Sequence, residues 1–251
     1  WPEVSDNFRR YAISPLRNVS DALPKLNSQT DFYLHAKSEA QRVAYLESKT
    51  GLKAITSAGA YGYLRGMIEI LETALSDGVQ HLLVLDDDAV FHKDAAKIFS
   101  KAIQDLPDNW KILQLGSLQY NWSREWIRWR GSHLYSQLGS SVGSHAVGLH
   151  RDVLPFLLDH AKRMELPYDI GALSAAVRAF PDENFVVYPN IAIQSLSDSD
   201  IGSSGFAASK TLDEIYATYR WDKADYKETV NRGWFRKIRL KTWHPLKTGE
   251  S

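Results

Sequence analysis

Two short, almost continuously apolar segments separated by an amphipathic segment constrain the fold most strongly. Residues 81–85 have the sequence His-Leu-Leu-Val-Leu, and residues 111–115 have the sequence Lys-Ile-Leu-Gln-Leu. Such runs are typical of strands that are buried on both faces of a parallel sheet. Apolar side chains at helical spacing predict a helix over residues 95–103, with Asp94 as its N-cap. Strands that alternate with helices predict an α/β fold, a single Rossmann-type domain with a mostly parallel central sheet flanked by helices.

Apolar runs of strand length and apolar residues at helical spacing also predict the remaining elements. Apolar runs of strand length predict four further strands, at residues 31–35, 53–56, 146–150 and 185–195. Helical spacing predicts further helices at residues 38–48, 60–77, 152–164 and 169–180. The helix over residues 60–77 has an apolar stripe at positions 60, 64, 67, 68, 71, 74 and 75, and Gly78 is expected to end it. Another helix is predicted to begin at the capping-box pair Thr211 and Glu214. Residues 118–131 differ, because Trp and Tyr alternate there with Arg, and we expect a loop or hairpin that lies over a cleft.

Composition excludes several classes of protein. The chain has 251 residues, with 30 Lys plus Arg against 30 Asp plus Glu, and it has no cysteine. The balanced charge does not indicate nucleic-acid binding, and the lack of cysteine excludes zinc–thiolate sites and a cysteine nucleophile. No apolar run reaches the roughly 18 residues that a membrane span needs. We expect one domain over residues 30–226, between an irregular extension over residues 1–29 and a basic, aromatic tail over residues 227–251.

Three consecutive carboxylates follow the first buried strand, in the sequence Leu85-Asp86-Asp87-Asp88-Ala89. Along an extended backbone, side chains two residues apart point the same way, so Asp86 and Asp88 are expected to face one site. In an open α/β sheet, the carboxyl ends of the strands border the ligand crevice. Paired carboxylates there suit Mg²⁺ or Mn²⁺, which also bind the oxygens of a diphosphate. On the residues alone, a solvated acidic turn is the alternative.

The acidic triplet belongs to a series of motifs in a fixed order. It begins with Gly59-Ala60-Tyr61-Gly62, a helix, an apolar strand and the triplet, and it continues at residues 106–116, 146–151, 166–169, 188–194 and 197–201. This series, which covers roughly residues 30–226, resembles glycosyltransferase family 25 of the GT-A superfamily. That family includes lipopolysaccharide-type sugar transferases and collagen galactosyltransferase-like enzymes. The chain departs from the family at Gly66-Met67, where Ser-His is usual, and at residues 36–42, where an Arg-rich turn is usual.

The resemblance implies a GT-A-like fold and a metal-dependent hexosyltransferase. The enzyme would move a hexose, with galactose as the first choice, from a UDP-sugar to a hydroxyl of a glycan or glycoconjugate, with inversion. Asp86 and Asp88 would hold Mn²⁺ or Mg²⁺ against the diphosphate, and Asp87 would orient the strand end or bind the ribose. Asp169 matches the position of the family's general base, which removes the proton of the acceptor hydroxyl. On the residues alone, Asp169 is equally well explained as a helix N-cap.

Two further groups of residues have an expected role in binding. Gln194, Asp198 and Asp200 would belong to a late loop that folds over the donor, with a flexible polar loop as the alternative. The apolar rings of Trp122, Trp126 and Trp129 suit the faces of sugars, and core packing or a plain lid would explain them equally well.

Two other functions stay open. A nucleotidyltransferase on a similar sheet also uses paired aspartates and Mg²⁺, but it usually needs a basic, glycine-rich loop near its first strand. Ala36-Lys37-Ser38 is a poor version of such a loop. A catalytically inactive sugar-binding module is the second alternative, and Gly66-Met67 is the feature that favours it.

The C-terminal tail has a composition typical of segments that lie at a membrane interface. Residues 227–247 contain seven Lys and Arg against one acid, Glu228, and these cations alternate with Trp, Phe, Ile and Leu. Packing of the tail on an acidic body is the alternative. With the resemblance, we expect a nucleotide-sugar donor, a glycan or lipid-linked glycan acceptor and no nucleic acid as partners. We expect a cytoplasmic location, peripheral at the inner face of a membrane.

Overall fold

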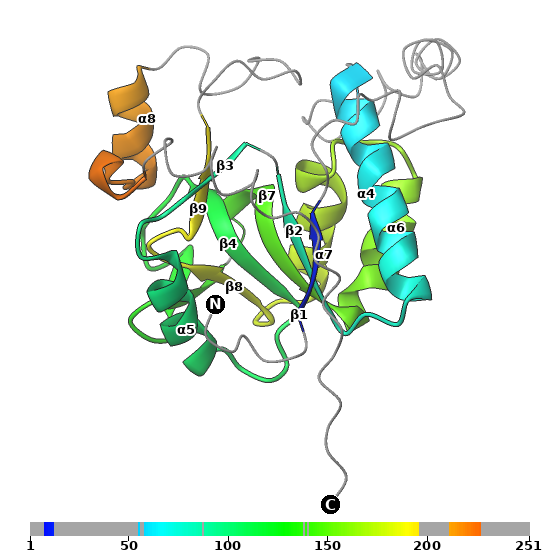
Figure 1. Ribbon diagram of the computed structural model, residues 1–251, viewed down its shortest axis with the longest axis horizontal. Helices are drawn as coiled ribbons and strands as arrows, with labels where there is room; N and C mark the ends of the chain where they lie inside the picture. Colours follow the sequence, from blue (N-terminus) through cyan, green and yellow to red (C-terminus); the bar gives the residue numbers. More distant parts are fainter. Residues whose placement is uncertain are drawn as a thin grey trace, which may run out of the picture.

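The structure of the protein is a computed structural model, shown in Figure 1. It describes residues 8–12, 55, 58–86, 88–137, 139, 141–195 and 211–226. The strand expected at residues 31–35, the helix expected at residues 38–48 and the tail over residues 227–251 lie outside this part of the chain. Of the strand expected at residues 53–56, only Ile55 is described.

The elements form two sheets and several helices. The larger sheet has seven strands, in the spatial order β1 (Phe8–Ala12), β2 (His81–Leu85), β7 (Ser141–His150), β4 (Ile112–Gln119), β8 (Asn184–Val187), β6 (Leu134–Gln137) and β5 (Ile127–Trp129). The smaller sheet consists of β3 (Ala89–Phe91) and β9 (Ala192–Gln194). The helical elements are α4 (Ala58–Ser76), α5 (Ala95–Gln104), η1 (Arg151–Val153), α6 (Leu154–Lys162), η2 (Asp169–Leu173), α7 (Ser174–Ala179), α8 (Leu212–Tyr219) and η3 (Lys223–Asp225).

The expectation of a mostly parallel sheet is wrong. The pairs β1–β2 and β4–β8 are parallel, whereas the other four neighbouring pairs of the larger sheet are antiparallel. The reason is β7, which lies between β2 and β4 and runs antiparallel to both. β2 and β4 still point in the same direction, but they do not hydrogen-bond to each other. The protein is therefore a mixed α/β protein whose central sheet is mostly antiparallel.

Helices cover both faces of the larger sheet. On one face, α4, α6, η2 and α7 form one hydrophobic cluster with β2 and β7, and Figure 1 shows α4 and α6 lying side by side. On the other face, α5 forms a second cluster with alternate residues of the same strands. In β2, Leu82 and Val84 belong to the first cluster and Leu85 to the second, as the two-residue period of a strand requires.

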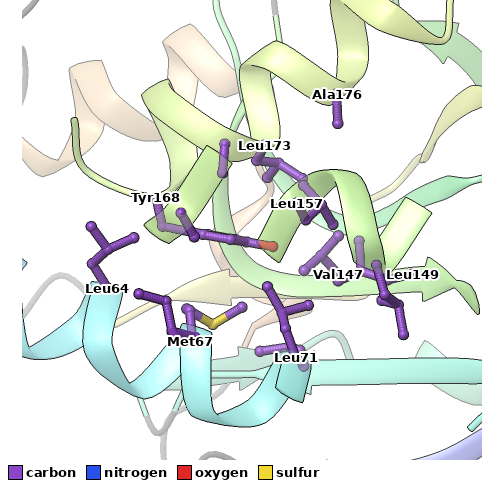
Figure 2. Packing of buried hydrophobic residues seen from close by; sticks show 14 of the residues in the cluster. Leu64, Met67, Leu71, Val147, Leu149, Leu157, Tyr168, Leu173 and Ala176 are labelled. Carbon is purple, nitrogen blue, oxygen red and sulfur yellow. The ribbon is translucent and has the colours of Figure 1, made fainter. Parts of the chain in front are cut away.

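The helix expected at residues 60–77 is confirmed as α4. Most of its predicted apolar stripe is buried, at Ala60, Leu64, Met67, Ile68, Leu71 and Ala74, whereas Leu75 is only partly buried. Figure 2 shows Leu64, Met67 and Leu71 on the side of α4 that faces the rest of the cluster. Gly78 follows with a φ of +69° and donates its N–H to the carbonyl of Leu75, which ends the helix as expected.

The smaller sheet joins the C-terminal part of the described chain to the core. β3 and β9 are antiparallel, and α8 packs Ile215 and Tyr219 against Val90 and Ile193 of these strands. The predicted capping box is confirmed at the start of α8, because the side chain of Thr211 accepts from the backbone N–H of Glu214 and the side chain of Glu214 accepts from the backbone N–H of Thr211.

Other differences from the expected elements have local causes. β4 does not end at residue 115 but continues through Gly116, where its pairing with β7 shifts register. The strand expected at residues 185–195 is divided into β8 and β9, which are separated by the cis Tyr188–Pro189 peptide bond. Asp94 precedes α5 as expected, but its side chain makes no capping hydrogen bond. Residues 8–12, expected within an irregular extension, form the edge strand β1.

No helix in the described part of the chain is both long enough and apolar enough to cross a membrane.

The close approach of β9 to β4 predicts a strong effect of one added methyl group. A Cβ atom at Gly116 would overlap the carbonyl oxygen of Ala192 and the ring of His145. Gly116→Ala is therefore expected to lower the free energy of unfolding by about 1–3 kcal/mol, measured by urea denaturation. Gly66→Ala in α4 is the control, because a Cβ there meets no atom within 4 Å, and it is expected to stabilise by about 0.5–1 kcal/mol. Equal effects of the two changes would contradict this account of Gly116.

Candidate functional site

The acidic triplet lies where the chain passes from the larger sheet to the smaller one. The backbone N–H of Asp86 donates to the carbonyl of His145 at 2.8 Å, which extends the β2–β7 pairing by one residue. The N–H of Ala89 donates to the carbonyl of Asp86 at 3.2 Å and closes a four-residue turn. Asp88 lies in the turn that precedes β3, and the expectation that Asp86 and Asp88 face one site stays a prediction.

The side chain of Asp86 is held by a directed chain of hydroxyl groups. The hydroxyl of Tyr63, on α4, donates to Oδ1 of Asp86 at 3.1 Å and lies 2.8 Å from Oγ of Ser144, on β7. Since the single phenolic proton goes to the carboxylate, Ser144 donates its own proton to Tyr63. Burial and the charge of Asp86 raise the pKa of Tyr63 well above its usual value, so the phenol stays protonated. Asp86 is thus fixed by groups from the helix and strand on either side of it.

Asp169 lies next to this arrangement. The ring of Tyr63 contacts the ring of Tyr168, with 6.4 Å between their centroids, and Asp169 is the first residue of η2. Asp169 is not the N-cap that the sequence alone suggested, since that position is Tyr168. Burial raises the pKa of the Asp169 carboxyl, although the backbone N–H groups of Ile170 and of Asp169 itself oppose the shift. A carboxylate with a raised pKa is a better proton acceptor near neutral pH.

Asp88 and Gln194 are brought together by the smaller sheet. Ala89 is paired with Gln194 in the β3–β9 ladder, and the N–H of Ser195 donates to the carbonyl of Asp88 at 2.8 Å. The backbone at Asp88 and Ala89 is therefore paired with the end of β9. Asp87, Asp198 and Asp200 lie outside the described residues.

The donor chemistry of the turn fits a hard divalent cation. Asp86 and Asp88 supply carboxylate oxygens, the ligands that Mg²⁺ and Mn²⁺ prefer. Within the described ranges, no three His, Cys, Asp or Glu side chains are grouped to hold a metal ion. Two protein carboxylates are compatible with a cation that takes its other ligands from a bound diphosphate and water.

Tyr63, Ser144 and His145 were not identified as site residues from the sequence. Tyr63 directly follows the Gly59–Gly62 motif, which is the only local signal that could have drawn attention to it. Ser144 and His145 lie in the middle of β7, and their importance depends on the position of that strand in the sheet.

His145 contacts the turn through its backbone carbonyl, while its side chain lies in the core. Its side chain is fully buried, and its ring lies beside Gly116 and Ala192, where β7, β4 and β9 meet. Burial lowers the pKa of the His145 imidazole to about 4, and a backbone contact with Ala192 opposes the shift only in part. The imidazole is therefore neutral at physiological pH.

Comparisons with known proteins assign no family to this chain. No family model matches it, and a search of curated proteins finds no significant match. What the fold and site define is a mixed α/β protein with carboxylates at the carboxyl end of β2.

The hydrogen bonds of Tyr63 predict different effects for the same substitution at Tyr63 and at Tyr168. Tyr63→Phe removes a hydrogen bond to a carboxylate and is expected to lower the free energy of unfolding by about 1.5–3 kcal/mol. Tyr168→Phe is the matched control, because its buried hydroxyl has no hydrogen-bond partner among the described residues, and Figure 2 shows it within the hydrophobic cluster. That change is expected to be neutral or stabilising. Urea denaturation measures both, and a larger loss for Tyr168→Phe would contradict the arrangement.

His145 predicts a loss of stability in acid. A histidine in the unfolded chain titrates near pH 6.5, but His145 titrates at about 4 in the folded protein. Between these pH values the unfolded state binds this proton and the folded state does not. The contribution of the neutral His145 to the free energy of unfolding is therefore complete above pH 6.5 and is lost as the pH falls towards 4. We expect the free energy of unfolding in a chelating buffer to fall by about 2–3 kcal/mol more between pH 7.5 and 4.5 in the wild type than in His145→Gln. The same pH dependence in both proteins would contradict the assignment.

Proposed function

We propose that the protein is a metal-dependent hexosyltransferase that uses a UDP-sugar donor, with UDP-galactose as the first candidate. The acceptor is a hydroxyl of a glycan or glycoconjugate. The observation that supports this proposal best is the placement of Tyr63 between Asp86, at the end of β2, and the Tyr168–Asp169 segment. Asp86 and Asp169 lie on either side of Tyr63 in different surroundings. Such a pair of carboxylates suits two roles, with Asp86 binding a ligand and Asp169 accepting a proton.

In this proposal, Asp86 and Asp88 hold Mn²⁺ or Mg²⁺, which would neutralise charge on the departing diphosphate. Tyr63 and Ser144 keep the Asp86 carboxylate in one orientation before the donor binds. Gln194 lies beside Asp88 and offers an amide to the donor. Asp87 is assigned to the ribose. Asp198 and Asp200 are assigned to the loop that covers the donor.

Asp169 is the proposed general base. It accepts the proton of the acceptor hydroxyl while the acceptor oxygen bonds to the anomeric carbon of the sugar. The bond between that carbon and the diphosphate oxygen breaks, and UDP leaves with the bonding electrons. A single displacement of this kind inverts the configuration at the anomeric carbon. The raised pKa of Asp169 supports this role, because it increases the basicity of the carboxylate.

Met67 stands where the resembled family usually has His, but its position is not part of the group formed by Tyr63, Ser144 and Asp86. Met67 is fully buried in the core cluster under α4, and Figure 2 shows it among Leu64, Leu71 and Tyr168. The substitution therefore concerns packing beneath the site. We further propose a cytoplasmic enzyme that acts at the inner face of a membrane, with the basic, aromatic composition of residues 227–251 as the support.

Two isosteric changes are expected to separate donor binding from turnover. Asp88→Asn removes charge that offsets the cation, so calorimetry should show loss of Mn²⁺-dependent UDP binding. Asp169→Asn should keep that binding but slow UDP release from the UDP-sugar, in the presence of acceptor, by roughly 10²–10⁴-fold. Asp159→Asn on α6 is the control, since Asp159 is exposed and pairs with Arg163.

The same assay distinguishes the alternatives. Incubation with a panel of nucleotide sugars and Mn²⁺ should release free UDP from one of them. Release of inorganic diphosphate from a nucleoside triphosphate would instead indicate a nucleotidyltransferase. Binding of sugar without any turnover would indicate an inactive sugar-binding module, and unchanged UDP affinity in Asp88→Asn would contradict the metal site.

A further inference from the structure

The hydrogen bond from Tyr63 makes the two carboxylate oxygens of Asp86 unequal. The hydroxyl of Tyr63 donates to Oδ1 of Asp86 at 3.1 Å, and the same hydroxyl lies 2.8 Å from Oγ of Ser144. A cation binds a carboxylate either through one oxygen or through both. In the folded protein, Oδ1 of Asp86 is therefore already engaged by a proton before any cation binds.

The donor of this hydrogen bond is held in place by contacts that do not involve Asp86. Tyr63 lies on α4, and its side chain packs against the hydrophobic cluster under that helix. The centroid of its ring is 6.4 Å from that of Tyr168, with 58° between the ring planes. Figure 2 shows Tyr168 across from Leu64 and Met67 of the same helix. Because the ring is packed, the hydroxyl keeps its direction towards Oδ1.

Asp86 is also fixed through its backbone. Its N–H donates to the carbonyl of His145 at 2.8 Å, and its carbonyl accepts from the N–H of Ala89 at 3.2 Å. Both main-chain groups and one side-chain oxygen of Asp86 thus have defined partners. A carboxylate held in this way adjusts poorly to a cation that needs a flexible site.

Divalent cations differ in how they bind carboxylates. Mg²⁺ requires a nearly octahedral set of oxygens at about 2.1 Å, and Mn²⁺ suits similar octahedral oxygen sites. Ca²⁺ takes about six to eight oxygens at longer distances, in a flexible geometry that often includes both oxygens of one carboxylate. A cation bound through both oxygens of Asp86 would share Oδ1 with the proton of Tyr63, whereas a cation bound through the other oxygen alone would not.

We propose that Tyr63 determines cation specificity, by making Asp86 a one-oxygen ligand that favours Mn²⁺ or Mg²⁺ over Ca²⁺. Tyr63 is a positioning residue in this proposal, because it acts on the cation through Asp86. Hydrogen-bond partners of metal ligands commonly contribute about 10- to 100-fold to metal affinity. The inference deepens the proposed function and rests on one part of it, the assignment of a cation to Asp86 and Asp88. It does not depend on the sugar donor or on the general base.

Cation binding to the 251-residue chain is measured without nucleotide, so that the result does not depend on transferase activity. The paramagnetic resonance signal of free Mn²⁺ gives the dissociation constant of Mn²⁺, and competition by Ca²⁺ gives the ratio of the two constants. We expect the wild type to bind Mn²⁺ about tenfold or more tightly than Ca²⁺, and Tyr63→Phe to reduce this ratio by roughly tenfold. Partial unfolding lowers both apparent affinities by the same factor, so the ratio does not depend on the lower stability of the variant.

Tyr168→Phe is the matched control. It keeps the ring beside Tyr63 and removes a hydroxyl that has no hydrogen-bond partner among the described residues, so the ratio should stay unchanged. Ser144→Ala decides the question if Tyr63→Phe does not fold. It removes a hydrogen-bond partner of the Tyr63 hydroxyl, and the ratio should fall in the same direction but by less.

An unchanged ratio in Tyr63→Phe, an equal fall in Tyr168→Phe, or a wild type that does not prefer Mn²⁺ to Ca²⁺ would overturn the specificity role and leave the proposed function standing. Failure of the wild type to bind Mn²⁺ at all would overturn both the specificity role and the metal site. If the ratio shifts as expected but no nucleotide sugar releases UDP, the role of Tyr63 stands and the proposed transferase function fails.

Discussion

The hydrogen bonding of β7 to both β2 and β4 is the constraint on which the rest of the structure depends. By lying antiparallel between them, β7 brings Ser144 and His145 next to the end of β2. The carbonyl of His145 accepts from the backbone N–H of Asp86. Ser144 donates to Tyr63, and the hydroxyl of Tyr63 donates to the side chain of Asp86. A sheet in which β2 paired directly with β4 would give the acidic turn neither of these supports.

Close packing of β7, β4 and β9 buries polar groups, which costs stability. His145 is buried as a neutral imidazole, and Gly116 is needed because β9 passes so near to β4. The hydroxyl of Tyr168 is buried with no hydrogen-bond partner among the described residues. A fold tolerates such costs when other groups over-determine the local structure.

The sequence predicted the parts of the fold that depend on local patterns. The inner stripe of α4, the stop at Gly78 and the capping box of α8 were all correct, because each is encoded within a few residues. The position of β7 was not predictable, since strand order depends on contacts between distant segments. The same reason applies to the site, because Tyr63 is 23 residues from Asp86 and 81 from Ser144. The acidic triplet could be found from sequence, but not the residues that hold it.

The surroundings of the two carboxylates separate the roles proposed for them. Asp86 accepts a hydrogen bond from Tyr63, whose raised pKa keeps the phenol protonated and able to donate. Asp169 lies in surroundings where burial raises its pKa, so its charged form is disfavoured and its affinity for a proton is increased. A charged carboxylate suits a cation, and a more basic one suits the removal of a proton from a hydroxyl. Tyr63 contributes to both, because its hydroxyl binds Asp86 and its ring packs on the residue before Asp169.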